Sequence, residues 1–585
     1  MHRTKLTIVL AGAVVLSVLF FSQFTAAQQA NKCGDGICDE FEEADSTLCT
    51  RDCQGRQECV QEGKDLGPVY PGNTRQCCDG LTPYIPPGRV GTRGICAKSS
   101  LVPVPKLKEQ ISKDSPFGAS GAFSRPYVKD DAVNREEILR MVSGLKEPYS
   151  HVQDIGSKWI RPGIDITWPL VQPTPDHVEK GVYEWAVVDN LYGRVPPGVN
   201  ALANICVGQG TKPGTWKFVN KYVEERYLQY VKAIVERYDG DGLNDMPGLK
   251  NPIKYWQIEN EPAFPNLDSS TFNLDWIGFS HIVEITYTAI KESDREAKIS
   301  LGGVAGGHAV KKNDPFFQKE IEGFYFPLLQ NLRGRYIDIF DIHYYEEPRE
   351  GPEQWKRAWK DMKTAYQLFR RQLDQNGYQK TKIWFTETAI PSKPVGERAQ
   401  ASDLVKRFIH PLTIGVKKIF WSKMIEGEYP LNVDQISSHF GLVYDGIGQG
   451  DPGYGVKKLA YYTYKKMVEV LEGSDWKNIK TIKEEQNDAY GLFLYKVTRN
   501  GKPVYVGWFD CFDEQKCSVM RIDLRAELAF DRDVKTVKIT EAVPRYETGK
   551  EVVDYAAAFK SETKATDGGK ITIALEETPV FVEGE

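Results

Sequence analysis

Two glutamates could act together as a catalytic pair. Glu261 lies in the stretch WQIENEP (residues 256–262), and Glu387 lies in WFTET (residues 384–388). Each comes at the end of a run of large apolar residues, the pattern of a buried strand. One carboxyl group can protonate the leaving oxygen of a glycosidic bond while a second attacks the anomeric carbon, if the two lie about 5–5.5 Å apart. The fold must therefore bring two distant segments together.

Strand-like and helix-like segments alternate between residues 118 and 472. Eight short apolar runs have strand character: 117–123, 158–166, 199–207, 253–260, 298–307, 337–345, 382–390 and 417–425. Longer segments between them carry apolar residues at helical spacing: 227–238, 276–293, 323–332, 353–373, 401–415 and 457–473. Eight such units predict an α/β fold, the (β/α)8 TIM barrel.

The main rival to a barrel is a doubly wound open sheet. Such sheets bind nucleotides through a glycine-rich turn, and GGVAGGHAV (residues 302–310) does not have the G-x-G-x-x-G spacing. In a barrel, by contrast, catalytic groups lie at the C-terminal ends of the strands. Glu261 ends the fourth strand and Glu387 the seventh, and these two ends face each other across the barrel mouth.

The motifs around both glutamates resemble those of clan A, the retaining glycoside hydrolases with catalytic glutamates on strands four and seven. This clan includes β-xylosidases, α-iduronidases, cellulases and mannanases. The resemblance covers the barrel and implies that Glu261 is the acid/base and Glu387 the nucleophile. It also implies that Asn260 donates a hydrogen bond to the sugar 2-hydroxyl.

The same resemblance implies roles for four further residues. Arg161, in WIRPG, would lie near the nucleophile, although a surface ion pair is an equally good reading. His343 and Tyr345, in DIHYY, have the spacing of the clan's sixth-strand pair, and Tyr345 would steady the nucleophile through its hydroxyl. The adjacent Tyr344 leaves open which ring only packs. Trp421 would be the platform on which the sugar stacks.

Other polar and aromatic residues have structural readings. Simple alternation puts Glu259 on the same strand face as Glu261, but Pro262 ends the strand and turns the backbone, so we expect Glu259 to pair within or beneath the barrel. Asp338 and Asp341 are interpreted as structural. Trp168 and Trp216, in loops after strands two and three, are candidates for sugar stacking, with packing as the alternative.

The N-terminal part has the features of a secreted chain. A basic start, an apolar stretch and a small-residue site predict a signal peptide over residues 1–27, with an uncleaved membrane anchor as the alternative. Eight of the eleven cysteines fall between residues 33 and 96. They predict two disulfide-rich modules, over 28–56 and over 57–98. Four cysteines in the second, knottin-like module allow three connectivities.

The first module is acidic. Asp35, Asp39 and Asp52 suit a structural calcium ion, although an acidic disulfide loop without metal is the other reading. A linker over 99–117 leads to the barrel over 118–472, and a β-sandwich over 473–585 follows, with a hairpin at RNGK (499–502). Cys511 and Cys517 are close enough in sequence to form a disulfide. The apolar setting of Cys206 predicts a buried, inert thiol.

Charge and histidine content exclude other functions. The net charge is −5 and no long basic run occurs, so nucleic-acid binding is not expected. The eight histidines show no metal-ligand spacing, and we expect no catalytic metal. The sequence thus predicts a secreted or cell-surface retaining O-glycosyl hydrolase that acts on oligo- or polysaccharides. The alternative is an inactive carbohydrate-binding or adhesion protein on the same barrel.

Overall fold

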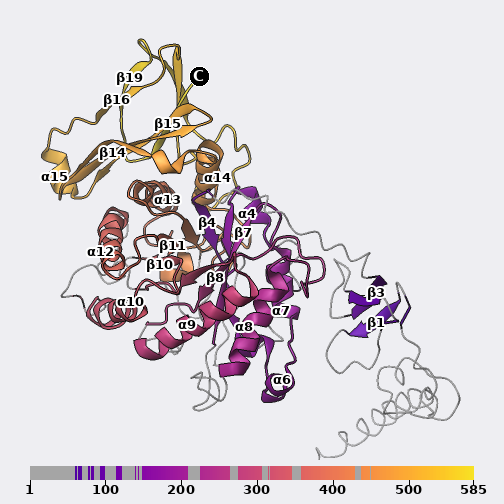
Figure 1. Cartoon of the computed structure of the whole chain (residues 1–585). Coiled ribbons are helices and arrows are strands. Elements are labelled where there is room, and N and C mark those ends of the chain that lie inside the picture. Colours follow the sequence, from indigo (N-terminus) through magenta and orange to yellow (C-terminus); the bar gives the residue numbers. More distant parts are fainter. Residues whose placement is uncertain are drawn as a thin grey trace, which may run out of the picture. The chain divides into compact units, whose positions relative to one another are not determined.

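The chain forms two compact units, Met1–Pro103 and Val104–Glu585, in a computed structural model (Figure 1). The structure describes parts of 60–98 and then the following residues: 114–121, 139, 143, 148–207, 224–263, 275–305, 314, 317–345, 358–427, 436–447 and 450–585. Three predictions fall outside them: the signal peptide over 1–27, the possible calcium module over 28–56, and Trp216. Among the described helices, none has the length and apolar character needed to cross a bilayer.

The first unit contains a small disulfide-bonded sheet. Strand β3 (Arg93–Lys98) pairs antiparallel with β1 (Asp65–Pro68) on one side and with β2 (Leu81–Tyr84) on the other. A disulfide joins Cys77 to Cys96, and Cys78 is also disulfide-bonded. The predicted disulfide-rich character of this segment is confirmed.

The second unit contains a closed parallel barrel. Its eight strands are β4 (Phe117–Ser120), β5 (Trp159–Arg161), β7 (Asn200–Cys206), β8 (Tyr255–Ile258), β9 (Lys298–Leu301), β10 (Ile339–Tyr344), β11 (Lys382–Thr388) and β12 (Ile419–Ser422). A two-residue strand, β6 (Ile166–Thr167), pairs with the end of β7. Strand β4 pairs with both β12 and β5, and β5 pairs with β7, so the sheet closes on itself. The barrel prediction is confirmed, and the open-sheet alternative is wrong because the ring has no free edge.

Helices surround the barrel, and α8 (Glu224–Tyr238) shows how an apolar face is buried against it. Helix α8 buries Tyr227, Tyr230, Val231 and Ile234, three or four residues apart, while its opposite side is polar. The other main helices are α9 (Trp276–Ser293), the π-helix η2 (Phe317–Tyr325), which continues into α10 (Phe326–Leu332), α12 (Met362–Gln375), α13 (Glu397–Leu412) and α14 (Leu459–Leu471). Shorter helices are α4 (Ser150–Asp154), α5 (Trp168–Val171), α6 (Pro175–Lys180), α7 (Ala186–Leu191), η1 (Tyr192–Arg194), η4 (Ala358–Asp361) and η5 (Ile436–His439).

A β-sandwich follows α14, as predicted. Its six-stranded antiparallel sheet has the order β13-β14-β15-β20-β17-β18, and a two-stranded sheet pairs β16 with β19. The bounds are η6 (Trp476–Asn478), β13 (Lys480–Gln486), β14 (Tyr490–Arg499), β15 (Lys502–Cys511), α15 (Glu514–Val519), β16 (Arg525–Ala529), β17 (Thr536–Glu541), β18 (Ser561–Ala565), β19 (Lys570–Ala574) and β20 (Val580–Gly584). The predicted hairpin joins β14 to β15 through Asn500 and Gly501, both with positive φ, and Cys511 bonds to Cys517.

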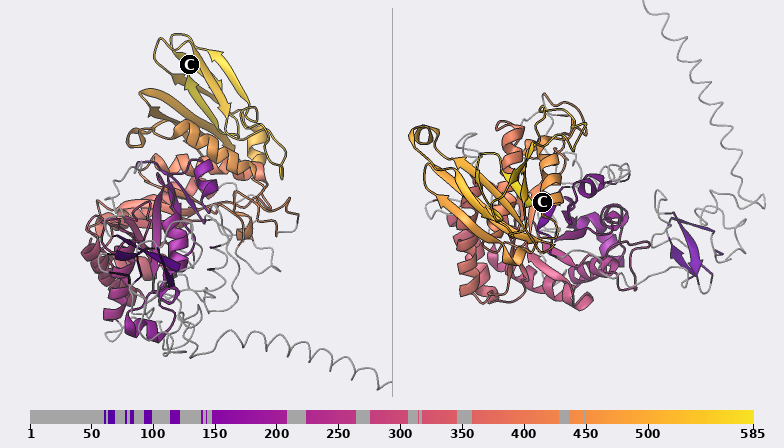
Figure 2. Two further views of the ribbon diagram at one scale, coloured as in Figure 1. Left: turned by 90° about the vertical axis from the view of Figure 1, so that its right-hand side faces the viewer. Right: turned by 90° about the horizontal axis from the view of Figure 1, so that it is seen from above.

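Alternation along β14 gives the large sheet two apolar faces. Leu492 and Leu494 pack in a core with Leu528 and Ile573 of the two-stranded sheet. The other face, which includes Phe493, packs on the barrel helices (Figure 2). The sandwich and the barrel therefore share a continuous apolar core.

A buried histidine lies at this shared core. His410 of α13 is fully buried, stacks edge-on against Trp359 and Phe493, and has Nδ1 2.9 Å from the Tyr495 hydroxyl. Burial, helped by the positive charge of Lys363, places the pKa of His410 well below its usual value. The folded protein thus holds this imidazole neutral.

Acid should therefore weaken the fold through His410. In the unfolded chain this histidine binds a proton near pH 6.5, whereas the folded protein does not, so stability falls as pH drops below that value. From pH 7.5 to 5.5 the loss from this residue alone is about 1.4 kcal/mol. Urea unfolding of the wild type and of His410→Asn over this range tests the prediction.

The asparagine variant should lack that part of the pH dependence, because its amide keeps a partner for Tyr495 but cannot titrate. His343, whose pKa is raised, adds stability that is complete below pH 6.5, so it does not mask the effect at low pH. If the free energy of unfolding changed with pH equally in the wild type and in His410→Asn below pH 6.5, the prediction would be contradicted.

Candidate active site

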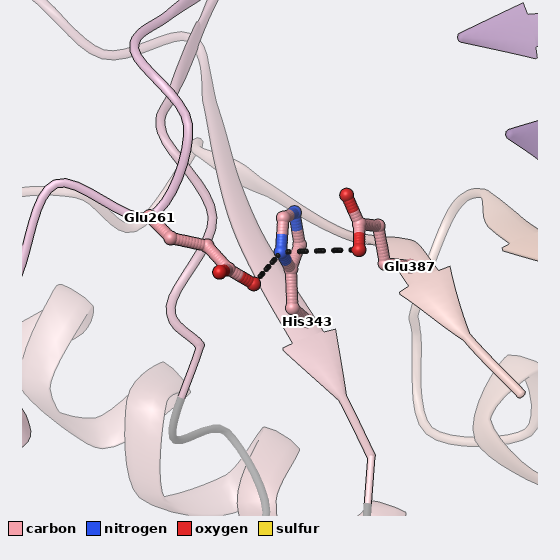
Figure 3. A group of neighbouring side chains, drawn as sticks. All are labelled: Glu261, His343 and Glu387. Carbon is pink, nitrogen blue, oxygen red and sulfur yellow. Dashed lines mark hydrogen bonds and ion pairs between the residues drawn. The ribbon is translucent and has the colours of Figure 1, made fainter. Parts of the chain in front are cut away.

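A sharp backbone turn at the end of β8 separates the two glutamates of the ENEP segment. Glu259 and Glu261 have φ angles of 63° and 45°, in the left-handed region, which costs roughly 1–2 kcal/mol for a residue with a side chain. Glu259 is buried and accepts a hydrogen bond from the Val207 amide at 2.6 Å, beyond the end of β7. The side chain of Glu261 is 17% exposed and is directed toward Glu387 (Figure 3). Glu259 thus pairs within the barrel, as expected.

Glu387 is held by two donors near the end of β11. Arg161 Nη1 donates to Oε1 at 2.7 Å, and the Tyr345 hydroxyl donates to Oε2 at 2.9 Å. Burial raises the pKa of Glu387, but the positive charges of His343 and Arg161 and the Tyr345 hydrogen bond outweigh it, so this pKa lies below its usual value. The arrangement keeps Glu387 ionised, as a nucleophile requires.

His343 lies between the two carboxyl groups. Its Nδ1 is 2.6 Å from Glu261 Oε1 and 3.6 Å from Glu387 Oε2 (Figure 3). One atom from each of the three side chains lies within 4.8 Å of the other two. Burial lowers the pKa of His343, but the charges of Glu387 and Asp341 and the hydrogen bonds to Asp341 and Glu261 raise it well above its usual value. Two glutamates far apart in sequence thus meet at one imidazole.

A glycine makes room for this imidazole. A Cβ at Gly303, just after β9, would lie 2.1 Å from His343 Nε2, far inside any allowed contact. The ring can stand between the carboxyl groups only because this position carries no side chain.

Arg161, at the end of β5, forms hydrogen bonds to three side chains of the site. Besides Glu387, its guanidinium donates to Asn260 Oδ1 at 2.7 Å and to Gln257 Oε1 at 2.9 Å. Arg161 is 6% exposed, so the surface ion-pair reading is wrong. Because the Asn260 oxygen faces Arg161, its amino group is the end that can donate to a ligand.

Tyr345 and Tyr344 have different environments. Tyr345 stacks on Phe440 with ring centroids 5.2 Å apart and bonds to the nucleophile candidate. Tyr344 is buried and stacks on Phe385 at 6.0 Å. Tyr345 therefore belongs to the site, and Tyr344 packs.

The predicted tryptophan platforms are corrected by the structure. Trp421 has no exposed surface, and its Nε1 donates to the Phe440 carbonyl at 2.9 Å. Neither ring face is open to a sugar, so the structure does not support the platform role. Trp168 is also buried, donates to Gln172 and stacks on Tyr230, and it is a packing residue. Both indoles complete the core rather than a sugar-facing surface.

Sequence reasoning missed a buried polar group beneath the glutamates. Gln257 of β8 was not selected, and Asp341 of β10 was interpreted as structural, yet Gln257 Nε2 donates to Asp341 Oδ2 at 2.6 Å. Asp341 lies two residues before His343, on the same side of the strand, and Gln257 is two residues before Glu259. Polar residues at alternate positions of an otherwise apolar strand were the signal that could have revealed them.

The remaining thiol and acidic clusters play no part in this site. Cys206 is buried, and burial raises its pKa well above the usual value, which favours the inert reading. Within the part of the chain that the structure describes, two other carboxylate clusters are compact, Asp239 with Asp241 and Asp245, and Glu426 with Asp445 and Asp451. Burial raises the pKa of Asp239 to about 7, and Lys458 already pairs with Glu426, so we assign no metal to either.

Comparisons with known proteins find similarity to one curated sequence and to several solved structures. A segment of 162 residues is 24% identical to a curated protein of Aspergillus clavatus named probable mannan endo-1,4-β-mannosidase A. The likeness is to glycoside hydrolases. The match covers 28% of this chain and 39% of that relative, so the chain spans about two fifths of the relative's length. No protein-family model matches the chain.

Two solved structures similar to this chain are glycoside hydrolases as well. A glucosidase from Croceicoccus marinus is 14% identical with a TM-score of 0.48, covering 82% of this chain and 98% of its own. A family 51 α-L-arabinofuranosidase from Bifidobacterium longum is 12% identical with a TM-score of 0.48, covering 81% and 96%. The barrel assignment itself rests on the strand pairing of this chain.

Proposed function

We propose that this protein is a retaining O-glycosyl hydrolase with Glu261 as acid/base and Glu387 as nucleophile. The observation that carries the proposal is the separation of the two carboxyl groups, whose nearest oxygens lie within 4.8 Å. Retaining enzymes place these groups about 5–5.5 Å apart, whereas inverting enzymes need about 6.5–9.5 Å to admit a water molecule. The geometry favours direct attack by a carboxylate.

The first step follows from the charges around each group. Glu387, kept ionised by Arg161 and Tyr345, attacks the anomeric carbon and forms a glycosyl ester. Glu261 gives its proton to the departing oxygen as the glycosidic bond breaks. The amino group of Asn260 is available to bind the sugar 2-hydroxyl.

The second step restores both groups. Glu261, now a carboxylate, takes a proton from a water molecule as that water attacks the anomeric carbon. The ester bond to Glu387 breaks, the sugar leaves with the configuration it had in the substrate, and both glutamates return to their starting states.

Substrate and location extend the proposal. The similar proteins are named for different sugars, so we propose an oligo- or polysaccharide substrate without assigning the sugar. The sequence features of residues 1–98 support a secreted or cell-surface enzyme, with calcium in the first disulfide-rich module as a further option. We propose no catalytic metal.

The anomer released first tests the mechanism. A panel of chromogenic glycosides identifies a substrate, and proton NMR during early turnover should show product with the substrate's anomeric configuration. Inverted product would exclude Glu387 as nucleophile. Glycan binding without turnover across the panel would favour the inactive carbohydrate-binding alternative. Loss of activity with EDTA would favour a metal-dependent hydrolase if restoring calcium alone did not recover it.

A further inference from the structure

A buried polar cluster lies directly beneath the two glutamates. Asp341, His343, Gln257 and Thr386 all have 0% exposed surface and come from strands β8, β10 and β11. The cluster touches Glu261 through His343, and it touches Arg161, the partner of Glu387, through Gln257. Any charge held there acts on both reacting groups.

Asp341 receives donors on both carboxylate oxygens. The Thr386 amide donates to Oδ1 at 3.0 Å, while Gln257 Nε2 donates to Oδ2 at 2.6 Å and the Thr386 hydroxyl donates to the same oxygen. Each of these three groups contributes a hydrogen, so the Asp341 oxygens act as acceptors.

The two neighbours of His343 Nε2 fix where its hydrogen lies. Nε2 is 3.3 Å from Asp341 Oδ2 and 3.3 Å from the Thr386 hydroxyl oxygen. The carboxylate offers only lone pairs. The hydroxyl has already given its hydrogen to Asp341, so it too faces Nε2 with a lone pair. Nε2 therefore carries a hydrogen.

The opposite ring nitrogen then meets Glu261 in one specific way. Nδ1 and Glu261 Oε1 are 2.6 Å apart, a distance at which two bare lone pairs repel and one hydrogen must lie between them. Since Nε2 already holds its own hydrogen, the hydrogen between Nδ1 and Oε1 is a second one. It belongs to Glu261 when His343 is neutral and to His343 when the ring is cationic.

We propose that Asp341 is a positioning residue that holds His343 in its Nε2–H form, so that Nδ1 and Glu261 share the proton used to release the leaving group. The charged groups that face His343 are Asp341 on β10, Glu261 after β8 and Glu387 on β11. Gly303 after β9 brings none, and the positive Arg161 lies beyond Glu387. The proton that reaches the leaving oxygen departs from this pair, and the water of the second step returns it.

Asp341 should consequently set the pH at which the pair loses its proton. A negative charge close to the ring favours the protonated pair, so its removal should release the proton at lower pH. In a plot of kcat/KM against pH, activity falls on the alkaline side as the pair loses its proton, and we call this part of the profile the alkaline limb. Replacing Asp341 by asparagine should shift the alkaline limb to lower pH by about one pH unit or more. A residue that only packed would lower activity at every pH without moving the limb.

Asp338→Asn is the matched control. It makes the same chemical change just before the same strand, where Asp338 accepts from the Ile299 amide at 3.0 Å and pairs with Lys291 at 3.3 Å. Its alkaline limb should coincide with that of the wild type. If the alkaline limb of Asp341→Asn also coincided with that of the wild type, the inference would be overturned.

A second measurement needs no activity. In ¹⁵N-labelled wild-type protein, with the His343→Asn variant used for assignment, NMR should show His343 Nε2 protonated on both sides of the limb. Nδ1 alone should change with pH. An Nε2 without hydrogen at a pH above the alkaline limb would overturn the inference even if Asp341→Asn failed to fold.

The inference rests on the proposed function only for its kinetic test. Absence of any glycosidase activity would refute that function, whereas the NMR result still decides the role of Asp341.

Discussion

Replacing Glu387 by alanine is expected to lower kcat about 10⁴-fold or more, because no other group in the site can form the glycosyl ester. The other glutamate of the site, Glu261, is across His343 and serves the leaving group instead. KM for the substrate should change far less than kcat, since the sugar-binding groups remain. Steady-state kinetics on the best chromogenic glycoside measures the loss.

Azide gives this prediction a sharper form. The missing side chain leaves space beside the anomeric carbon, and azide can attack from that side while Glu261 still protonates the leaving group. Glu387→Ala with azide should therefore yield a glycosyl azide of the configuration opposite to that of the substrate. The same treatment of wild type should give no such product.

The fold of the variant must be checked separately. Glu387 pairs with buried Arg161, and removing one partner of a buried pair costs about 3–5 kcal/mol in a typical protein. Arg161 keeps Asn260 and Gln257 as acceptors, which reduces the loss. A folded Glu387→Ala enzyme with near-normal kcat in the absence of azide would rule out the proposed mechanism.

The sequence was sufficient to predict the barrel because its strands are buried on both faces. Continuous apolar runs such as those around Trp256 and Phe385 identify such strands, and eight of them separated by amphipathic helices leave few arrangements. The ends of strands four and seven then predicted that Glu261 and Glu387 would meet. Local pattern and topology were enough for this part of the site.

The parts that could not be predicted depend on neighbours distant in sequence. Trp421 is covered because Phe440, in a later loop, supplies the carbonyl that holds its indole. Asp341 gains its position from Gln257 and Thr386 on two other strands. The choice between Glu259 and Glu261 came from Pro262, but the left-handed φ angles that separate them are visible only in the structure. Strand alternation alone would have treated the two as equivalent.

Replacing Glu261 by glutamine should produce a loss that depends on the leaving group. For a sugar leaving group, which must be protonated as the bond breaks, kcat/KM should fall about 10²- to 10⁴-fold because the amide cannot supply a proton. For a dinitrophenyl glycoside, whose leaving group departs as a stable anion, kcat/KM should stay close to that of the wild type. Comparing a series of aryl glycosides for the two proteins measures this difference, and the alkaline limb of the pH profile should disappear in the variant.

Glu259→Gln is the matched control, since it makes the same change two residues away on a carboxylate that bonds to the Val207 amide instead of facing His343. Whatever activity that variant loses should be the same for good and poor leaving groups, because a distorted turn impairs binding and orientation without removing the proton donor. If Glu261→Gln instead lost activity equally on all aryl glycosides, Glu261 would be a binding group and the acid would have to lie elsewhere. If kcat/KM depends more steeply on the leaving group in Glu261→Gln than in the wild type, and Glu259→Gln shows no such change, the loss in Glu261→Gln is a loss of proton donation. A purely structural effect of the strained turn would not produce this difference.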